Sequence, residues 1–232
     1  MPACPAQLPL TAPAAVPAPA RSAVAAVAGA LTLAVALATV SGCTGPVPVS
    51  VASVASLPSD GWHGVSLPEP YAKPSLVLLD MNGRTFRIDR DTNRAVVLVT
   101  FGFTHCRTVC ADVLSAVADA VRPLDPGTRS RIELLFVTVD PTRDDARSLR
   151  AYLSRFDPTF LGLTGSPWQV RELGEELGVP VTTPQLLAGD YDVPHGAQVI
   201  GFGSDGLAHL IWMPGTPTAD LRADLVRLAS FS

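Results

Sequence analysis

Two cysteines, Cys106 and Cys110, stand four residues apart just after a run of apolar residues. If a helix begins there, residues i and i+4 share one face, so the two sulfurs would be close enough for a disulfide or for a metal ion between them. The N-terminus of a helix also favours thiolate over thiol. Thiolate is the nucleophile of thiol–disulfide chemistry and a ligand for soft ions such as Cu(I), and an added imidazole extends the choice to Cu(II).

The spacing of the pair separates the kinds of site it could form. Thioredoxin-type oxidoreductases place two residues between their cysteines, whereas three separate Cys106 from Cys110. A structural zinc site normally needs four ligands, and the sequence has no second pair of closely spaced cysteines. Haem attachment requires Cys-x-x-Cys-His, which is absent. An inert disulfide is the structural alternative, although so short a loop would add little stability.

The elements around the cysteines alternate between strand and helix patterns. The apolar run over residues 95–103 predicts a buried central strand that leads directly to Cys106, and helical spacing of apolar residues follows from residue 108 to Pro123. The order of elements, a β-hairpin followed by βαβα, βα and ββα, predicts an α/β, thioredoxin-like fold with a central mixed sheet flanked by helices. The remaining strands are expected at residues 76–79, 85–88, 132–139, 160–163, 197–202 and 207–213, and the remaining helices at 146–156, 166–177 and from 217 onward.

Length and composition limit the function classes. A chain of 232 residues suits one domain plus an export or anchoring segment, and 47% hydrophobic with 16% charged residues allows a real core. The net charge of −4 lacks the basic excess of most nucleic-acid-binding proteins, so we expect no nucleic-acid partner. No Gly-rich phosphate loop follows any predicted strand, which argues against a nucleotide site.

An export signal is predicted over residues 1–42. An apolar run at residues 23–40 follows Arg21 and leads through small residues to Cys43. Residues 40–43 resemble the bacterial lipobox, in which the cysteine is lipidated, and more than one acyl chain gives stable anchoring. We therefore expect Cys43 to anchor the protein at the extracytoplasmic face of a bacterial membrane, where copper and disulfide chemistry are possible. An uncleaved membrane-spanning helix and a cleaved soluble form are the alternatives.

The segment after the signal is rich in proline. Residues 43–75 are interpreted as an extended tether between membrane and domain. Trp62 and His63 lie in this segment and are expected in a solvent-exposed loop. The thioredoxin-like, copper-binding domain is then predicted over residues 76–232.

Four segments of this domain resemble one known family. Residues 101–110 read Phe-Gly-Phe-Thr-His-Cys-x-x-x-Cys, and residues 136–144 read Phe-Val-Thr-Val-Asp-Pro-x-Arg-Asp. Residues 156–165 contain Phe-Asp-Pro and Phe-Leu-Gly-Leu-Thr-Gly, and residues 189–195 read Gly-Asp-Tyr-x-Val-x-His. All four are similar to segments of the SCO/SenC family of copper chaperones, which are used in assembling the copper centre of cytochrome c oxidase.

The resemblance implies a copper site. Carried over by position, Cys106 and Cys110 are the thiolate ligands and His195 is the imidazole ligand of Cu(I) or Cu(II). It also implies a metallochaperone that receives copper from a donor protein and delivers it to the copper-bearing subunit of cytochrome c oxidase, or to another cuproprotein. Because copper would move by ligand exchange, such a protein need not be an enzyme.

The sequence departs from the family pattern beside each ligand. Arg107 and Ala111 stand where the family usually has proline after each cysteine, and Pro194 and Gly196 flank the histidine in place of Asp and Ser or Thr. The missing carboxylate would remove a partner that tunes metal affinity. Arg107 is expected to lower the pKa of the thiols and to shift the balance toward thiol–disulfide chemistry.

Other functions and other donors are weighed against this interpretation. As a thiol–disulfide reductase, the protein would use Cys106 as the attacking thiol and Cys110 as the resolving thiol. A peroxiredoxin-like peroxidase is a third possibility, but the expected active-site surroundings are not evident. His105 and His209 are not expected to bind copper, and Met213 is expected in the core at the end of a strand.

Overall fold

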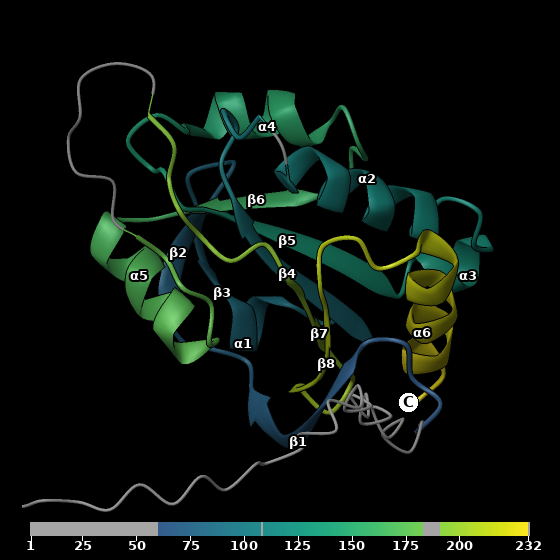
Figure 1. Cartoon of the computed structure of the whole chain (residues 1–232). Coiled ribbons are helices and arrows are strands. Elements are labelled where there is room, and N and C mark those ends of the chain that lie inside the picture. The colour runs from purple at the N-terminus through teal and green to yellow at the C-terminus, as the bar shows by residue number, and fades with distance from the viewer. Residues whose placement is uncertain (1–59, 108, 183–190, 232) are drawn as a thin grey trace, which may run out of the picture. The chain divides into compact units, whose positions relative to one another are not determined.

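The computed structural model describes residues 60–107, 109–182 and 191–231 (Figure 1). The compact unit to which they belong spans Ala55–Ser232. The predicted signal at residues 1–42 and the predicted lipidation site Cys43 lie outside the described residues. Within the described ranges, no helix combines the length and the hydropathy needed to cross a membrane.

A single eight-stranded sheet forms the centre of the described domain. Its order is β1-β8-β7-β4-β5-β6-β2-β3, with β4, β5 and β6 parallel and every other neighbouring pair antiparallel. The sheet is therefore mixed, as predicted. The strands are β1 (Val65–Ala72), β2 (Val77–Asp80), β3 (Thr85–Arg87), β4 (Val96–Gly102), β5 (Ile132–Thr138), β6 (Leu161–Thr164), β7 (Val199–Phe202) and β8 (Leu207–Trp212).

Helices cover both faces of the sheet. Because side chains alternate along a strand, Val96 and Leu98 of β4 enter one core cluster and Val97 and Val99 enter the other. The first cluster receives buried residues from α2, α4 and α6, and the second receives them from α1 and α5. The helices are α1 (Ile88–Asp91), α2 (Val109–Val121), α3 (Pro126–Arg129), α4 (Ala146–Leu153), α5 (Pro167–Glu176) and α6 (Thr218–Ser230).

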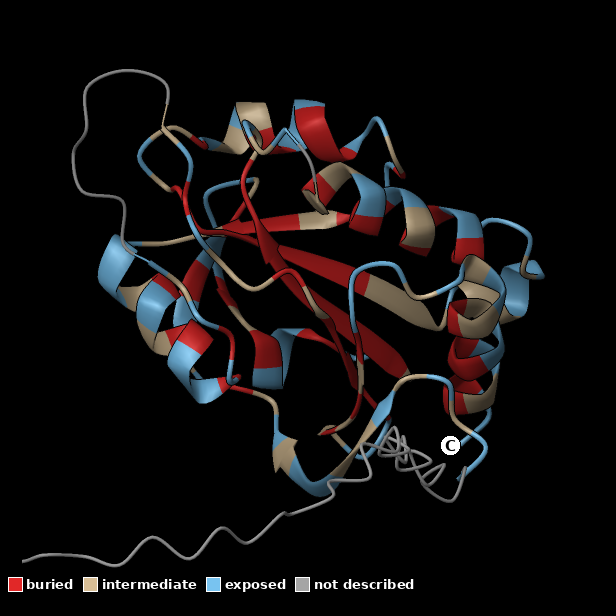
Figure 2. Cartoon of the chain, viewed as in Figure 1, coloured by how far each residue is buried: buried red, intermediate tan, exposed pale blue. Residues whose placement is uncertain are grey.

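Burial is deepest in the central strands (Figure 2). All seven residues of β4 are buried, which explains why its sequence is a continuous apolar run rather than an alternating one. The crossover from β4 through α2 to β5 is the predicted βαβ unit. It places the loop after β4, which carries Cys106, at the carboxyl edge of the parallel strands, where α/β proteins commonly bind ligands.

The start of the domain was predicted wrongly. Residues 65–72, assigned to the tether, form β1, which pairs with β8 and closes one edge of the sheet. Proline cannot donate to a strand ladder but is tolerated on an edge strand, and the pairing of β1 is irregular between Ser66 and Tyr71, around Pro68 and Pro70. Because of these prolines, residues 65–72 did not show the sequence pattern of a strand and were assigned to the tether.

Trp62 and His63 are also more ordered than a tether implies. Trp62 packs against the first core cluster, with its ring 6.0 Å from that of Phe231. The His63 side chain is 45% exposed, as expected for a loop, but its Nδ1 lies 2.9 Å from Asp224 of α6. The folded domain therefore begins well before residue 76.

Candidate metal and thiol site

The loop after β4 presents Cys106. After Gly102 the chain turns, and the Cys106 amide donates a hydrogen bond to the Phe103 carbonyl at 3.1 Å. The sequence pattern suggested that Cys106 lies on the first turn of the helix. Helix α2 begins at Val109, however, so Cys106 lies in the loop before the helix. It is partly exposed, and its thiol is free.

Cys110 occupies the second position of α2 and is nearly inaccessible, with 2% of its surface exposed. Burial, with a further contribution from a hydrogen bond to Cys106, raises the pKa of the Cys110 thiol well above its usual value. The lowering expected from the helix start and from Arg107 is therefore wrong for this thiol, because loss of solvation disfavours the charged form more strongly. A coordinating metal ion reverses this preference, since it removes the thiol proton.

His195 faces Cys110 from a distant part of the chain. Its Nε2 lies 3.4 Å from Cys110 Sγ, and its Nδ1 lies 2.7 Å from the Val193 carbonyl oxygen. Since a carbonyl can only accept, Nδ1 is the donor in this contact, and in a neutral ring Nε2 is then the nitrogen with the lone pair. A metal-binding histidine is oriented in the same way, with its second nitrogen donating to a carbonyl or carboxylate. The Val193 carbonyl supplies such a partner in this chain, in which position 194 is a proline.

The three predicted ligands lie in one region but are not arranged as a finished metal site. Cys110 contacts both Cys106 and His195. Across the described ranges, no three His, Cys, Asp or Glu side chains are grouped closely enough to hold one ion. Two sulfurs and an imidazole nitrogen are nevertheless donors that suit copper chemically. The ligand roles of Cys106, Cys110 and His195 stay a prediction.

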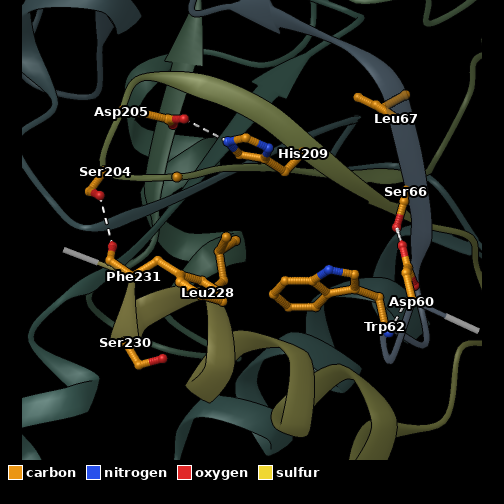
Figure 3. Close-up of a pocket in the computed structure, with 11 residues that line it drawn as sticks. Asp60, Trp62, Ser66, Leu67, Ser204, Asp205, His209, Leu228, Ser230 and Phe231 are labelled. Carbon is orange, nitrogen blue, oxygen red and sulfur yellow. Dashed lines mark hydrogen bonds and ion pairs between the residues drawn. The ribbon is translucent and has the colours of Figure 1, made fainter.

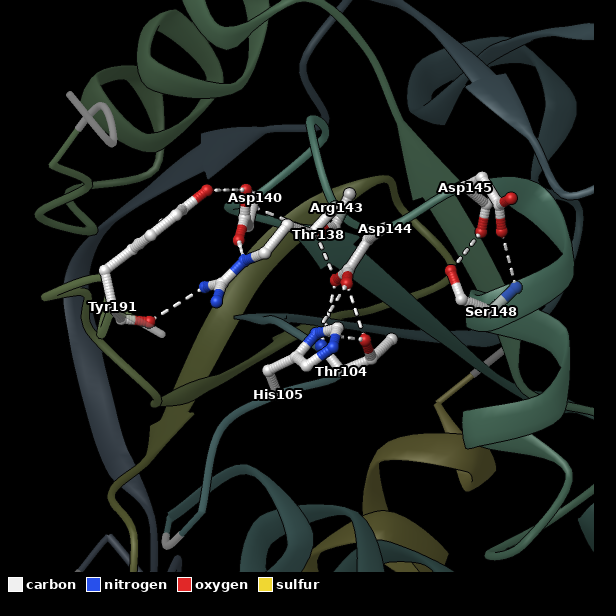
Figure 4. A network of polar contacts seen from close by, with 9 residues as sticks. All are labelled: Thr104, His105, Thr138, Asp140, Arg143, Asp144, Asp145, Ser148 and Tyr191. Atoms are coloured by element: carbon white, nitrogen blue, oxygen red, sulfur yellow. Dashed lines mark hydrogen bonds and ion pairs between the residues drawn. The ribbon is translucent and has the colours of Figure 1, made fainter. Parts of the chain in front are cut away.

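The turn after β5 supports the loop that carries Cys106 (Figure 4). Asp144, whose side chain is fully buried, accepts hydrogen bonds from the Thr104 amide at 2.9 Å and the Thr104 hydroxyl at 2.6 Å. It also accepts from the Thr138 hydroxyl at 2.7 Å. Several hydrogen bonds to one buried carboxylate offset its loss of hydration and fix the loop two residues before Cys106.

The same turn supports the loop that carries His195. The buried Asp140 accepts from the Tyr191 hydroxyl at 3.0 Å and from the Nε of Arg143. A terminal nitrogen of Arg143 donates to the Tyr191 carbonyl at 2.9 Å, and its guanidinium lies 3.6 Å from the centre of the Tyr191 ring. From the sequence, these residues were recognised only as parts of family segments and no role was predicted for them. The available signal was an Asp-Pro-x-Arg-Asp run after a buried strand, at the same sheet edge as Cys106.

The remaining histidines and Met213 lie elsewhere. His105 is half exposed and sits 3.7 Å from Asp144, while His209 pairs with Asp205 at 2.8 Å. Neither takes part in the Cys110–His195 contact. Met213 was expected in the core, but it follows the last residue of β8 and is 55% exposed.

A cavity of about 670 Å³ lies apart from the thiols (Figure 3). It is lined by residues of α6, β1 and the β7–β8 turn, among them Trp62, Phe231 and the His209–Asp205 pair. The β7–β8 turn follows Phe202, which pairs with Val97 at the beginning of β4, whereas Cys106 follows the end of β4. The cavity is therefore at the opposite end of the sheet from the candidate site.

Comparison with known proteins agrees with this arrangement. The family model described as SCO1/SenC matches residues 68–230, which include both cysteines and His195. This chain belongs to the SCO1/SenC family. The resemblance predicted from four sequence segments is thereby confirmed.

Individual SCO1/SenC relatives are similar over most of the domain. A protein of Stutzerimonas stutzeri named as copper-binding is 36% identical over 140 residues, which cover 60% of this chain and 68% of that protein. The mitochondrial SCO2 homologue of Danio rerio is 39% identical over 133 residues, covering 56% of this chain and 47% of the relative. The human SCO2 homologue is 38% identical with 49% of its length covered. The chain thus spans about half the length of these two relatives.

Solved structures confirm the fold. The solution structure of apo Sco1 from Thermus thermophilus covers 72% of this chain and 96% of its own, with 34% identity and a TM-score of 0.65. ScoI of Bradyrhizobium japonicum, solved with copper bound, covers 68% and 99%, with 27% identity and a TM-score of 0.60. The predicted thioredoxin-like α/β fold is correct for this member of the SCO1/SenC family.

Proposed function

We propose that this protein is a metallochaperone that binds copper through Cys106, Cys110 and His195 and delivers it to the copper centre of cytochrome c oxidase during assembly. The observation that carries the proposal is the contact between Nε2 of His195 and Cys110 Sγ at 3.4 Å. Membership of the SCO1/SenC family and the copper bound by the Bradyrhizobium relative support it.

The unequal exposure of the two thiols suits the binding and release of a cargo ion. Cys110 is buried beside His195, whereas Cys106 is partly exposed in a loop. A donor or client ligand approaching from solvent would reach Cys106 first, so copper would pass by exchange of one ligand at a time. The high pKa of Cys110 means that copper uptake by this thiol releases a proton.

The location and the partners belong to the same proposal. The sequence of residues 40–43 favours lipidation of Cys43, which would hold the domain at the extracytoplasmic membrane face within reach of a copper donor and an oxidase subunit. Replacing Cys43 with Ala is expected to move the protein from the membrane fraction to the soluble fraction. Retention of the variant in the membrane would support the spanning-helix alternative.

Copper titration of the reduced protein tests the ligand set. The parent is expected to bind one copper ion, and His195→Ala is expected to weaken binding by more than about a hundredfold, beyond the range typical of residues that only support a ligand. His209→Ala is the matched control, because His209 pairs with Asp205 at the other end of the sheet. Equal copper affinity in the parent and His195→Ala would refute the three-ligand assignment.

A parallel disulfide-reduction assay separates the competing function. Disulfide exchange needs the two thiols but not the imidazole, so His195→Ala is expected to leave any exchange rate largely unchanged. A parent protein that reduces disulfides rapidly and does not retain copper would favour the thiol–disulfide reductase.

A further inference from the structure

Residues 191–198, the described segment that carries His195, form no helix and no regular strand. Near His195 its backbone is held by one isolated bridge to Val181 and by hydrogen bonds that pair Thr182 with Pro194 at 3.1 Å and Gly196 with Pro180 at 2.9 Å. These contacts hold residues 194–196 to residues 180–182, the segment that follows α5, whereas the thiols lie in the segment that follows β4. The spacing between His195 and the cysteines therefore depends on contacts from another element.

Arg143 provides such contacts. It donates to the Tyr191 carbonyl at 2.9 Å, lies 3.6 Å from the centre of the Tyr191 ring and is hydrogen-bonded to Asp140. The Tyr191 hydroxyl closes the triangle by donating to the same carboxylate at 3.0 Å. The planar guanidinium can make these hydrogen bonds and stack on the ring together, which an ammonium group cannot reproduce.

Arg143 is also tied to the thiol side of the site. The next residue, Asp144, holds the Thr104 amide and hydroxyl in the loop before Cys106. The Arg143 guanidinium lies 5.5 Å from the centre of the Phe103 ring, and that ring is 5.7 Å from the His195 ring. One turn after β5 thus contacts both loops that bring the predicted ligands together (Figure 4).

We propose that Arg143 is a positioning residue that holds the His195 loop at the correct distance from Cys110. This inference rests on the proposed copper function. Arg143 contacts Tyr191 of the His195 loop and the Phe103 ring that packs on the His195 ring, so its effect on copper passes through the placement of His195. Tyr191 and Asp140 act with it, since each of the three contacts the other two.

The decisive experiment compares Arg143→Lys with Arg150→Lys in the full-length, reduced protein. Lysine keeps the charge but loses the planar contacts. Arg150 is the matched control because it also donates to a main-chain carbonyl, that of Met81 at 2.6 Å, away from the cysteines. Arg143→Lys is expected to weaken copper binding about tenfold to hundredfold, the range found when groups that orient a metal ligand are changed. Arg150→Lys is expected to bind copper as the parent does.

A double variant shows whether Arg143 acts through the histidine. If it does, adding Arg143→Lys to His195→Ala causes no further loss of copper affinity. An equal loss in both backgrounds would overturn the proposal, as would parental affinity in Arg143→Lys itself. Tyr191→Phe is the milder second variant, should Arg143→Lys fail to fold. It removes only the hydroxyl bond to Asp140, and it too is expected to weaken copper binding.

A measurement without copper keeps this inference distinct from the proposed function. The ring nitrogen shifts of His195 in the metal-free protein report its hydrogen bonds to Val193 and Cys110. Arg143→Lys is expected to change these shifts, and Arg150→Lys is not. If the parent bound no copper, the proposed function would fail, but the His195 shifts would still test the positioning role of Arg143. Unchanged shifts in Arg143→Lys would refute the positioning role and leave the proposed function untouched.

Discussion

Gly102 shows how tightly the thiol site is packed at the scale of single residues. It ends β4, four residues before Cys106. A Cβ at this position would lie 2.6 Å from the Phe136 ring and 2.8 Å from Cys110 Sγ. Both distances are shorter than any normal contact, and Phe136 is fixed in the core. Gly102 therefore allows the buried thiol to lie directly against the end of the central strand.

Replacing Gly102 with Ala is expected to lower the free energy of unfolding by about 1 to 3 kcal/mol, the usual cost of overpacking a core. It is also expected to displace Cys110 from His195 and so to weaken copper binding. Urea unfolding and copper titration would measure the two effects. Gly127→Ala, in the exposed helix α3, is the control, since its Cβ would meet only the end of the Asp125 side chain. A fully stable Gly102→Ala protein with parental copper affinity would contradict this account.

At the scale of elements, the segment before β1 is fastened to α6 by one carboxylate. The buried Asp224 accepts from the His63 amide at 3.1 Å, the Gly64 amide at 2.8 Å and the Trp212 indole at 2.8 Å. The His63 ring lies 2.9 Å away from it as well. Burial alone would raise the pKa of Asp224, but these hydrogen bonds, first that of the His63 ring, outweigh it and lower the pKa.

The His63–Asp224 contact predicts a pH dependence of stability. The hydrogen bond to Asp224 raises the pKa of His63 above its ordinary value of about 6.5. A raised pKa in the folded state means that the ion pair stabilises fully below pH 6.5 and that this contribution is lost as the pH rises through the folded-state pKa. The stability difference between the parent and His63→Gln should therefore be larger at pH 5.5 than at pH 9, measured by urea unfolding. A difference that stayed constant or grew with pH would show that protonated His63 does not act here.

At the scale of the whole domain, the sheet separates two hydrophobic cores, one on each of its faces. Alternate residues of β4 enter the two clusters, so the helices packed on either face contact the same central strand. The two edge strands of the sheet are β3 and β1. Because β1 pairs along β8, which carries Trp212, the N-terminal segment is a structural part of the domain.

A chain that starts at residue 76 is therefore expected to be less stable than one that starts at residue 60. It loses β1 and the three groups that donate to the buried Asp224 from this segment: the His63 amide, the His63 ring and the Gly64 amide. A buried acceptor left without its hydrogen bond costs roughly 1 to 3 kcal/mol for each bond lost. We expect the free energy of unfolding to fall by at least about 3 kcal/mol. Calorimetric unfolding of both chains would measure this. Adding Asp224→Asn to the shorter chain should restore part of the loss, because a neutral amide tolerates missing donors better. Equal stability of the two chains would show that residues 60–75 do not stabilise the domain and act only as a tether.

The family and the order of elements from β2 onward, apart from the short helices α1 and α3, could be predicted from the sequence alone. Long apolar runs such as residues 95–103, and helical spacing after Cys106, are local signals that depend on burial in any fold. The turn that contains Asn82-Gly83 and the Ser166 cap of α5 are equally local features. His195 was found through its family segment, not through any property of its neighbours in the chain.

Only the tertiary structure decided how those residues meet. The pairing of β1 with β8 joins segments more than 130 residues apart, and its prolines hide the strand pattern. The pKa of Cys110 depends on burial by residues from several elements, which overrides the helix start visible in the sequence. The contact of His195 with Cys110 and the contacts of Arg143 with Tyr191 likewise join segments that are far apart in the sequence. Local sequence constrains conformation within a few residues, whereas these features depend on where the completed fold brings distant residues together.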